Sequence, residues 1–351
     1  MINRFRVLRS HHPDERREWV DLWHEWPTRE PFAHPAYLEA FLQENQTAVC
    51  GIQTSPDGSV LLPLILRPLN SFSWASKTEW NDASTPYGYG GAYFWGDVDC
   101  DAYWNCLDDW AKQNRIVSLF ARLSLFANSI LPFRGPTRYV MDNVIRSLDL
   151  DEDAMWMDYE HKVRKNVNKA TRSDVTVEWD LTGERLEEFQ SIYASTMVRR
   201  EASAGFFFAN SFFEDLIKGS PECLAFVHAI KNGRVISTEL ILLGADHAYS
   251  YLGGTDEDSF DLRPNDLLKH EIFRWCREQG KKFFVLGGGL AQEDGLLKYK
   301  ISFAPKTGRV PFYVGERIYD QEAADALVSM RRAATPTWGP SASFFPSYRS
   351  P

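Results

Sequence analysis

Apolar residues in this chain occur in short runs, with polar turns and longer amphipathic stretches between them. The longest apolar runs, such as Val60–Leu66 and Leu240–Leu243, have the length of a β-strand. Longer segments have helical spacing, for example Leu267–Gln279, for which Asn265 is a candidate N-cap. Strands interleaved with helices predict an α/β fold with mixed, partly antiparallel sheets.

Three landmarks occur twice along the chain, in the same order and at nearly constant spacing. An aromatic segment where a short helix begins comes first, a turn dipeptide followed by an apolar strand comes second, and a tryptophan-containing helix that leads directly into an apolar strand comes third. The turn dipeptides are Asp57-Gly58 and Asn232-Gly233, and both predict two-residue hairpins because these residues tolerate positive φ. The repeated order predicts a tandem duplication.

The duplication predicts two domains, residues 1–150 and residues 151–310. The acidic stretch Leu148–Asp153 marks their boundary, because acidic residues suit the start of the helix expected near Met155. Residues 334–351 are rich in proline, serine and aromatic residues, and we expect them to form a loosely held tail.

Composition narrows the class of protein. The 351 residues are 44% hydrophobic and 25% charged, as in a packed globular protein, and the net charge of −9 argues against a surface that coats DNA. No run approaches the roughly 18 apolar residues that span a bilayer, and Met1–Ser10 lacks the apolar stretch of a secretion signal. Five cysteines without metal-ligand spacing indicate reduced thiols, so we expect a cytoplasmic protein that binds no metal.

One basic segment, Tyr159–Arg172, has helical spacing. Its basic side chains form two neighbouring stripes, which comprise His161, Lys165 and Lys169 in one and Arg164, Asn168 and Arg172 in the other. Adjacent cations predict a phosphate or carboxylate site, and the alternative is a solvated helix face.

Three further segments are candidates for binding. Arg199 ends a helix that begins near Glu184, where it can clamp a carboxylate or phosphate or simply interact with the helix C-terminus. The Tyr87–Gly91 segment alternates tyrosine and glycine and either lines a pocket or forms a structural turn. Gly287–Gly289 follows a predicted strand and can expose N–H groups to a phosphate or oxyanion.

Lys300 lies between aromatic residues in the apolar segment Tyr299–Phe303. Its ammonium either reaches water along apolar surface or points into a pocket as a fixed cation. The sequence has no nucleophile signature such as GxSxG and no HExxH motif. This absence favours direct transfer between two bound substrates.

Several motifs together resemble the FemAB-like branch of the GNAT acyltransferase superfamily, over roughly residues 30–315. They are Tyr87–Gly91, the basic helix with Lys169-Ala170, Thr196–Arg200, Gly233–Ser237, Tyr251–Thr255, Gly287–Gly289 and Tyr299–Phe303. The resemblance implies two tandem GNAT-like domains, with the C-terminal strand, at about 311–333, returning to complete the first.

The resemblance also implies roles for individual residues. Lys300 is the implied catalytic residue, which holds the donor end or stabilises developing negative charge. The residues implied to bind the acceptor are Arg199, Arg164, Lys165, Tyr251, Tyr87 and Tyr89. The residues implied to bind the donor are Gly287, Gly288, Gly289, Tyr299 and Phe303.

The implied activity is transfer of an aminoacyl or acyl group to an amine, without a tightly bound cofactor. The co-substrate is aminoacyl-tRNA or acyl-CoA, and the implied acceptor is a peptidoglycan precursor, UDP-linked or lipid-linked. A missing Gln/Arg-x-x-Gly-x-Gly/Ala loop favours the aminoacyl donor, while the acidic composition favours acyl-CoA. Two alternatives stay open: an acyl-CoA-dependent N-acetyltransferase acting on a cell-envelope sugar or small amine, and a non-catalytic protein that binds an anionic cell-wall intermediate.

Overall fold

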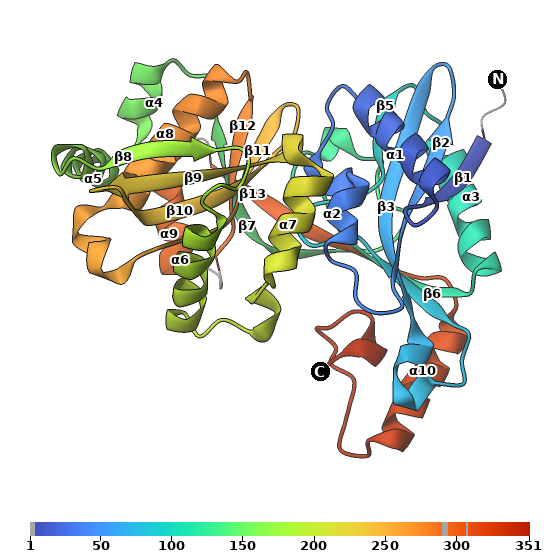
Figure 1. Cartoon of the computed structure of the whole chain (residues 1–351). Coiled ribbons are helices and arrows are strands. Elements are labelled where there is room, and N and C mark those ends of the chain that lie inside the picture. Colours follow the sequence, from blue (N-terminus) through green and yellow to red (C-terminus); the bar gives the residue numbers. More distant parts are fainter. Residues whose placement is uncertain (1–3, 290–293, 307) are drawn as a thin grey trace. The chain divides into compact units, whose positions relative to one another are not determined.

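The chain forms two compact units in the computed structural model, which describes residues 4–289, 294–306 and 308–351. The first unit comprises Met1–Pro27, Phe32–Val140 and Phe312–Pro351, and the second comprises Thr28–Pro31 and Met141–Pro311. The chain passes from the first unit to the second within β7 (Thr137–Ser147) and returns within β13 (Arg309–Ile318), as the colours of Figure 1 allow the reader to follow.

In the first unit the strands lie in the order β1-β2-β3-β4-β6-β13, and β5 pairs with β3. β4 and β6 are parallel and are connected through α3, whereas the other pairs are antiparallel. The elements are β1 (Arg4–Arg9), α1 (Pro13–Glu25), α2 (Pro35–Glu39), β2 (Thr47–Thr54), β3 (Gly58–Pro68), β4 (Asn81–Ser84), β5 (Tyr93–Gly96), α3 (Cys100–Gln113), β6 (Ile116–Arg122) and α10 (Gln321–Ala334).

In the second unit the order is β7-β12-β11-β10-β9-β8. β11 and β12 are parallel and are connected through α8, whereas the other pairs are antiparallel. The elements are α4 (Glu152–Asp158), α5 (His161–Arg172), β8 (Thr176–Asp180), α6 (Leu186–Arg199), α7 (Asn210–Gly219), β9 (Leu224–Lys231), β10 (Arg234–Leu243), β11 (His247–Thr255), α8 (Pro264–Glu278), β12 (Phe283–Gly287) and α9 (Gly295–Ile301).

These topologies confirm the predicted α/β class with mixed sheets. Each unit contains an antiparallel hairpin, a third strand, a long helix and a strand parallel to the third. The succession is β2-β3-β4-α3-β6 in one unit and β9-β10-β11-α8-β12 in the other, although the first also carries β5. The repeated landmarks in the sequence therefore correspond to repeated topology. None of the helices within the described ranges has the length and apolar content needed to cross a bilayer.

The two predicted hairpin turns differ in the structure. Asn232 and Gly233 both have positive φ and connect Lys231 directly to its partner Arg234, which confirms a two-residue turn. Gly58 instead begins β3, where a Cβ would lie 2.6 Å from the Asp97 carbonyl oxygen. The glycine there permits close approach to β5, so the two-residue turn predicted at Asp57-Gly58 is wrong.

Helices cover both faces of the second unit's sheet. Because successive strand residues point to opposite faces, Ala225 and Val227 of β9 pack into the core beneath α5 and α8. Phe226 points the other way and meets Phe189 of α6 edge-to-face at 5.0 Å between ring centres. α8 begins at Pro264 and Asn265 lies inside it, so the prediction that Asn265 is the N-cap is wrong.

The last residues of the chain are anchored rather than loosely held. After β13 the chain forms α10, which also belongs to the first unit. The segment that follows α10 packs onto this unit with the Tyr348 side chain fully buried. The Tyr348 hydroxyl lies 2.8 Å from Ser118 Oγ and donates to Asp82 Oδ2 at 3.3 Å. The Asp82 carboxylate also pairs with Arg67 and Arg349. The polar composition of residues 334–351 concealed this anchor, because a few buried contacts suffice to hold the segment.

We predict that Asp82→Ala will strongly destabilise the first unit. Asp82 has no exposed surface and neutralises two arginines, so its loss leaves their charges without a partner and costs about 3–5 kcal/mol of unfolding free energy. Urea unfolding measures this cost. The matched control is Asp14→Ala, which breaks a surface pair with Arg17 and should leave the midpoint unchanged. Similar midpoints for the two variants would contradict the anchor.

Candidate functional site

Lys300 lies in the last turn of α9, a short helix held at its start by Asp294. The Asp294 carboxylate accepts a hydrogen bond from the Leu297 backbone N–H at 2.7 Å, as an N-cap does. Leu297 then packs into the core, which orients the helix, and Lys300 is partly buried. The helix thereby places an ammonium group against the end of the neighbouring strand β12.

The partner of Lys300 is the backbone at the end of β12. Its Nζ donates to the Gly288 carbonyl oxygen at 2.6 Å. A Cβ on Gly288 would lie 2.5 Å from Met141 Sδ, and the preceding Gly287 has a φ of 82°, so both positions favour glycine. The predicted glycine run is therefore part of the site. At Gly288, however, the group facing Lys300 is a carbonyl that accepts, not an N–H that donates.

A second buried cation, Lys269 of α8, acts electrostatically on Lys300. Its ammonium pairs with the carboxylate of Glu239 on β10 and donates to Ser250 Oγ of β11 at 2.8 Å. The side chains of Lys269 and Glu239 are only 7% and 5% exposed, so the pair lies inside the unit. These three residues and Lys300 form what we call the lysine cluster.

The lysine cluster changes the acidity of Lys300. Burial, and next the positive charge of Lys269, lower the pKa of Lys300 to about 8, while Glu239 and Asp294 act in the opposite direction. A lysine with this pKa is present in both its charged and its neutral form near neutral pH. It can therefore stabilise negative charge or accept a proton.

The lysine cluster lies where β11 and β12 stop pairing. The parallel ladder covers only His247–Tyr249 against Phe283–Val285, although β11 continues to Thr255. Beyond the ladder Tyr251 is the extra residue of a β-bulge, because Leu240 faces Leu252 while Ile241 faces Ser250. The carboxyl ends of adjacent parallel strands are a common location for ligands in α/β sheets.

Arg199 lies at the carboxyl end of the same strand, β11. Its Nη2 donates to the Thr255 carbonyl at 3.2 Å and to Thr196 Oγ1 at 3.3 Å, and its guanidinium stands 4.9 Å from the centre of the Phe260 ring. Arg199 and Lys300 thus occupy the ends of neighbouring strands, each with its own backbone partner.

The structure gives one cation of the basic helix, α5, a structural role. Arg164 donates to the carbonyls of Met157 and Tyr159, which lie at the C-terminal end of α4. Helix ends leave such carbonyls without intrahelical partners, so the guanidinium serves as a cap there. Lys165 is exposed, as are His161 and Lys169 of its stripe. The anion site on these three residues stays a prediction.

Two of the aromatic residues assigned to donor binding have structural partners. Phe303 has no exposed surface and packs edge-to-face against Tyr159, Phe273 and Tyr299, so its assignment as a donor contact is wrong. The Tyr299 hydroxyl accepts a hydrogen bond from Asn265 Nδ2 at 2.7 Å.

Tyr87 and Tyr89 belong to the first unit and differ in exposure. Tyr87 is 42% exposed, and its carbonyl accepts from the Tyr37 hydroxyl at 2.9 Å. The Tyr89 ring packs edge-to-face on Phe32 and Phe312, each at 5.5 Å between ring centres. Tyr89 is therefore a packing residue of this unit, and only Tyr87 offers a broad surface to solvent.

The sequence interpretation missed the buried members of the lysine cluster and one residue that supports α9. Arg146 is fully buried and donates to the carbonyls of Phe303 and Met155 while it pairs with Asp158, which fixes the segment after α9 to α4. The available signal was a charged residue inside an apolar pattern: Glu239 within β10 and Lys269 within the apolar side of α8.

Each unit also has a cavity outside the lysine cluster. In the second unit a partly open cavity of about 390 Å³ lies between α5, α8 and α9. It is lined by Glu160, Lys162, Val163, Asn166, Asp266, Gly295, Lys298, Tyr299 and Ser302. Helical spacing places Lys300 on the opposite side of α9 from Lys298 and Ser302. The described residues bring together no group of three potential metal ligands.

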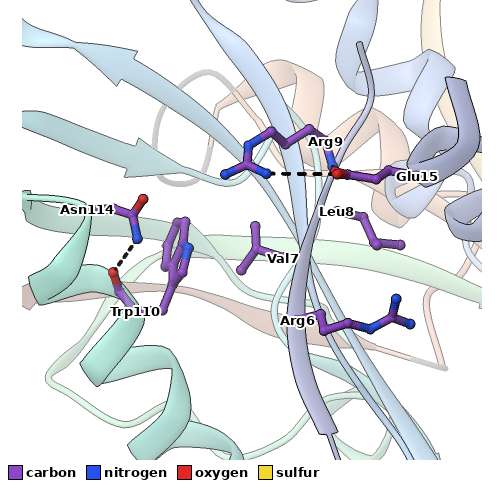
Figure 2. Close-up of a pocket in the computed structure, with 7 residues that line it drawn as sticks. All are labelled: Arg6, Val7, Leu8, Arg9, Glu15, Trp110 and Asn114. Carbon is purple, nitrogen blue, oxygen red and sulfur yellow. Dashed lines mark hydrogen bonds and ion pairs between the residues drawn. The ribbon is translucent and has the colours of Figure 1, made fainter. Parts of the chain in front are cut away.

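The cavity of the first unit is an open depression of about 350 Å³ between β1 and the end of α3. Figure 2 shows Val7 directed towards the Trp110 indole, with Arg9 paired to Glu15 and Asn114 bonded to the Trp110 carbonyl at 2.8 Å. Its arginines have carboxylate partners, Glu18 for Arg6 and Glu15 for Arg9, so the lysine cluster is the better candidate for chemistry.

We predict that Gly288→Ala will disturb the site through its backbone. The new Cβ must displace Met141 or the strand end, which should cost about 1–3 kcal/mol of unfolding free energy. The control is Gly295→Ala at the start of α9, where nothing lies within 4 Å of the added carbon. Chemical denaturation of both variants measures the difference. Equal stability would show that the glycine is not required for packing.

Comparison with known proteins relates one part of the chain to a known family of domains. Residues 158–300 match the family model described as "Acetyltransferase (GNAT) domain". No protein of curated function matches the sequence.

Among solved structures, FemX is similar over 89% of this chain and 98% of its own, with 13% identity and a TM-score of 0.61. L-PGS from Bacillus licheniformis is similar over 93% of this chain and 97% of its own, with 12% identity and a TM-score of 0.55. A conserved protein of unknown function from Bacteroides thetaiotaomicron has 13% identity and a TM-score of 0.57, over 90% of this chain and all of its own. At such identities these likenesses concern the fold. Residues 158–300 therefore match a GNAT acetyltransferase domain, and the chain shares its fold with FemX and L-PGS.

Proposed function

We propose that this chain transfers an aminoacyl or acyl group from an ester or thioester donor to an amine, at the carboxyl ends of β11 and β12. The observation that carries the proposal is Lys300, whose partly buried ammonium is fixed against the Gly288 carbonyl within the span that matches the acetyltransferase model. A fixed cation at a strand end suits a reaction in which negative charge develops on a carbonyl oxygen.

The proposed reaction is direct attack. The acceptor nitrogen forms a bond to the donor carbonyl carbon, the carbonyl oxygen becomes an oxyanion, and the bond to the leaving oxygen or sulfur then breaks. Lys300 stabilises the oxyanion together with backbone N–H groups of the Gly287–Gly289 segment. Because this stabilisation is stronger in the transition state than in the bound substrate, it raises the rate.

Charge at the start of α8 argues against binding of the coenzyme A diphosphate at this helix end. The segment between β11 and α8 contains Glu257, Asp258 and Asp261, and its last residue, Arg263, has a φ of 60°. Clustered carboxylates repel a diphosphate, so this helix start is poorly suited to the diphosphate of coenzyme A. The same carboxylates also repel the phosphates of a tRNA, so both donors are kept in the proposal.

The proposed acceptor is an amine on an anionic carrier, of which a UDP-linked or lipid-linked peptidoglycan precursor is the leading example. Arg199 supports this because its guanidinium is already oriented at the end of β11 and retains donors for a phosphate. Tyr251 at the bulge is the aromatic residue of this unit that we assign to the acceptor.

A second candidate is an acyl-CoA-dependent N-acetyltransferase that acts on an envelope sugar or small amine. The description of the matching family model, an acetyltransferase domain, favours it. It would use the same lysine cluster and differ in both the donor and the acceptor.

We predict that Lys300→Ala will lower turnover about 100-fold or more, because it removes the cation at the reacting carbonyl. The control is Lys298→Ala, a lysine two residues away that is exposed and faces the other side of α9. Transfer to amine acceptors is measured with labelled aminoacyl-tRNAs and acyl-CoAs, so that the same assay identifies the donor. A variant that lacks Lys300 and still works at the parent rate would remove its catalytic role. Donor binding without transfer by the parent protein would indicate a non-catalytic binding protein.

A further inference from the structure

We propose that the cavity between α5, α8 and α9 binds a free α-amino acid, whose ammonium group pairs with Asp266 and whose carboxylate pairs with Lys162. Both residues line this cavity, and Lys300 lies on the opposite side of α9 from it. The inference therefore goes beyond the transfer proposed above and does not depend on it.

The cavity has the size of a site for a small molecule. Its volume is about 390 Å³, near the lower end of the range found for ligand pockets, and it is partly open to solvent. All three helices belong to the second unit, so packing within one unit sets its walls. Val163 of α5 and Tyr299 of α9 contribute apolar surface, which suits the carbon atoms of a ligand.

Asp266 places a buried carboxylate in the wall of the cavity. It lies in the first turn of α8 and is only 6% exposed. Its Oδ1 accepts a hydrogen bond from Asn166 Nδ2 of α5 at 3.1 Å, which holds the carboxylate in place. Within the described part of the chain, no lysine, arginine or histidine forms an ion pair with it.

A buried carboxylate without a counter-ion is poorly stabilised, and burial accordingly raises the pKa of Asp266. An ammonium group in the cavity would provide the missing counter-ion.

The other polar groups of the wall are already bonded or solvated. The Tyr299 hydroxyl accepts from Asn265 Nδ2 at 2.7 Å, and the Ser302 hydroxyl donates to the Tyr299 carbonyl at 2.5 Å. Glu160 is exposed, so water solvates its charge. Asp266 is therefore the group of the wall that gains most from a charged ligand.

Lys162 provides the opposite charge at the opening of the cavity. It precedes Asn166 by one helical turn, so both side chains lie on the same face of α5, and Asn166 in turn binds Asp266. Lys162 is exposed and has no ion-pair partner among the residues that the structure places. A ligand that pairs with both residues carries an ammonium inside and a carboxylate outside, a short distance apart. An α-amino acid is the simplest such molecule.

The test uses the full-length chain and the common L-amino acids, each added at about 10 mM in a thermal-shift screen. A ligand that binds the folded protein raises its melting temperature by mass action. The amino acid with the largest shift is then titrated calorimetrically beside its two halves, the amine that lacks the carboxylate and the acid that lacks the ammonium. For alanine these halves are ethylamine and propionate.

We expect at least one amino acid to bind and each of its halves to bind about tenfold more weakly or worse. The amine leaves Lys162 without a partner, and the acid leaves Asp266 without one. This comparison separates recognition of a zwitterion from simple attraction of an amine to a carboxylate.

Two variants assign the charges. Asp266→Asn should lower the affinity about tenfold or more, while the urea midpoint without ligand does not fall, because the amide oxygen can still accept from Asn166. Lys162→Gln changes an exposed side chain and should weaken binding about threefold without affecting folding. The matched control is Lys169→Gln, another exposed lysine of α5 that does not line the cavity, and it should bind like the parent.

Three results would overturn the inference: no amino acid binds, one half binds as tightly as the whole molecule, or either variant binds like the parent. Should Asp266→Asn fail to fold, Lys162→Gln decides alone. Binding is measured without any acyl donor, so a negative result leaves the proposed transfer intact. Loss of transfer in Lys300→Ala, in turn, says nothing against this cavity.

Discussion

Strands β11 and β12 are parallel neighbours that pair at only three positions, and the rest of the site depends on this short ladder. Beyond it the two backbones have no ladder between them, and buried backbone groups must find other partners. Side chains from nearby elements provide them: Lys300 binds the Gly288 carbonyl and Arg199 binds the Thr255 carbonyl. Two cations of the site thus bind backbone carbonyls at the ends of these strands.

The first unit shows a different solution to the same geometry. Its parallel pair, β4 and β6, ends near Thr85 and Arg122. Arg122 donates from its backbone to Thr85 Oγ1 at 2.9 Å and from its guanidinium to the Thr85 carbonyl at 3.2 Å. The donors of Arg122 and the oxygens of Thr85 thus bind one another. At the corresponding place the second unit has Lys300, which can gain or lose a proton near neutral pH. This difference between the two copies is the reason why we assign the proposed chemistry to the second.

Much of the fold follows from local patterns in the sequence, and much of the site does not. Positive φ at Asn232-Gly233 is a local requirement and was predictable, whereas Gly58 is needed because β5 approaches it, which no local pattern reveals. The basic helix was correctly placed, yet the packing of α5 decided that Arg164 caps α4. Lys300 could be singled out from its aromatic neighbours, but Lys269 and Glu239 meet only through the crossing of α8 over the sheet.

We propose that acyl transfer takes place beside Lys300, where β11 and β12 stop pairing. A crystal structure with a non-hydrolysable donor analogue, an aminoacyl amide of a short RNA end or an acyl-CoA analogue, tests it most directly. We expect the acyl carbonyl oxygen of the analogue to lie within about 3 Å of Lys300 Nζ, at hydrogen-bond distance. An acyl group bound instead in the cavity between α5, α8 and α9, on the far side of α9 from Lys300, would contradict it.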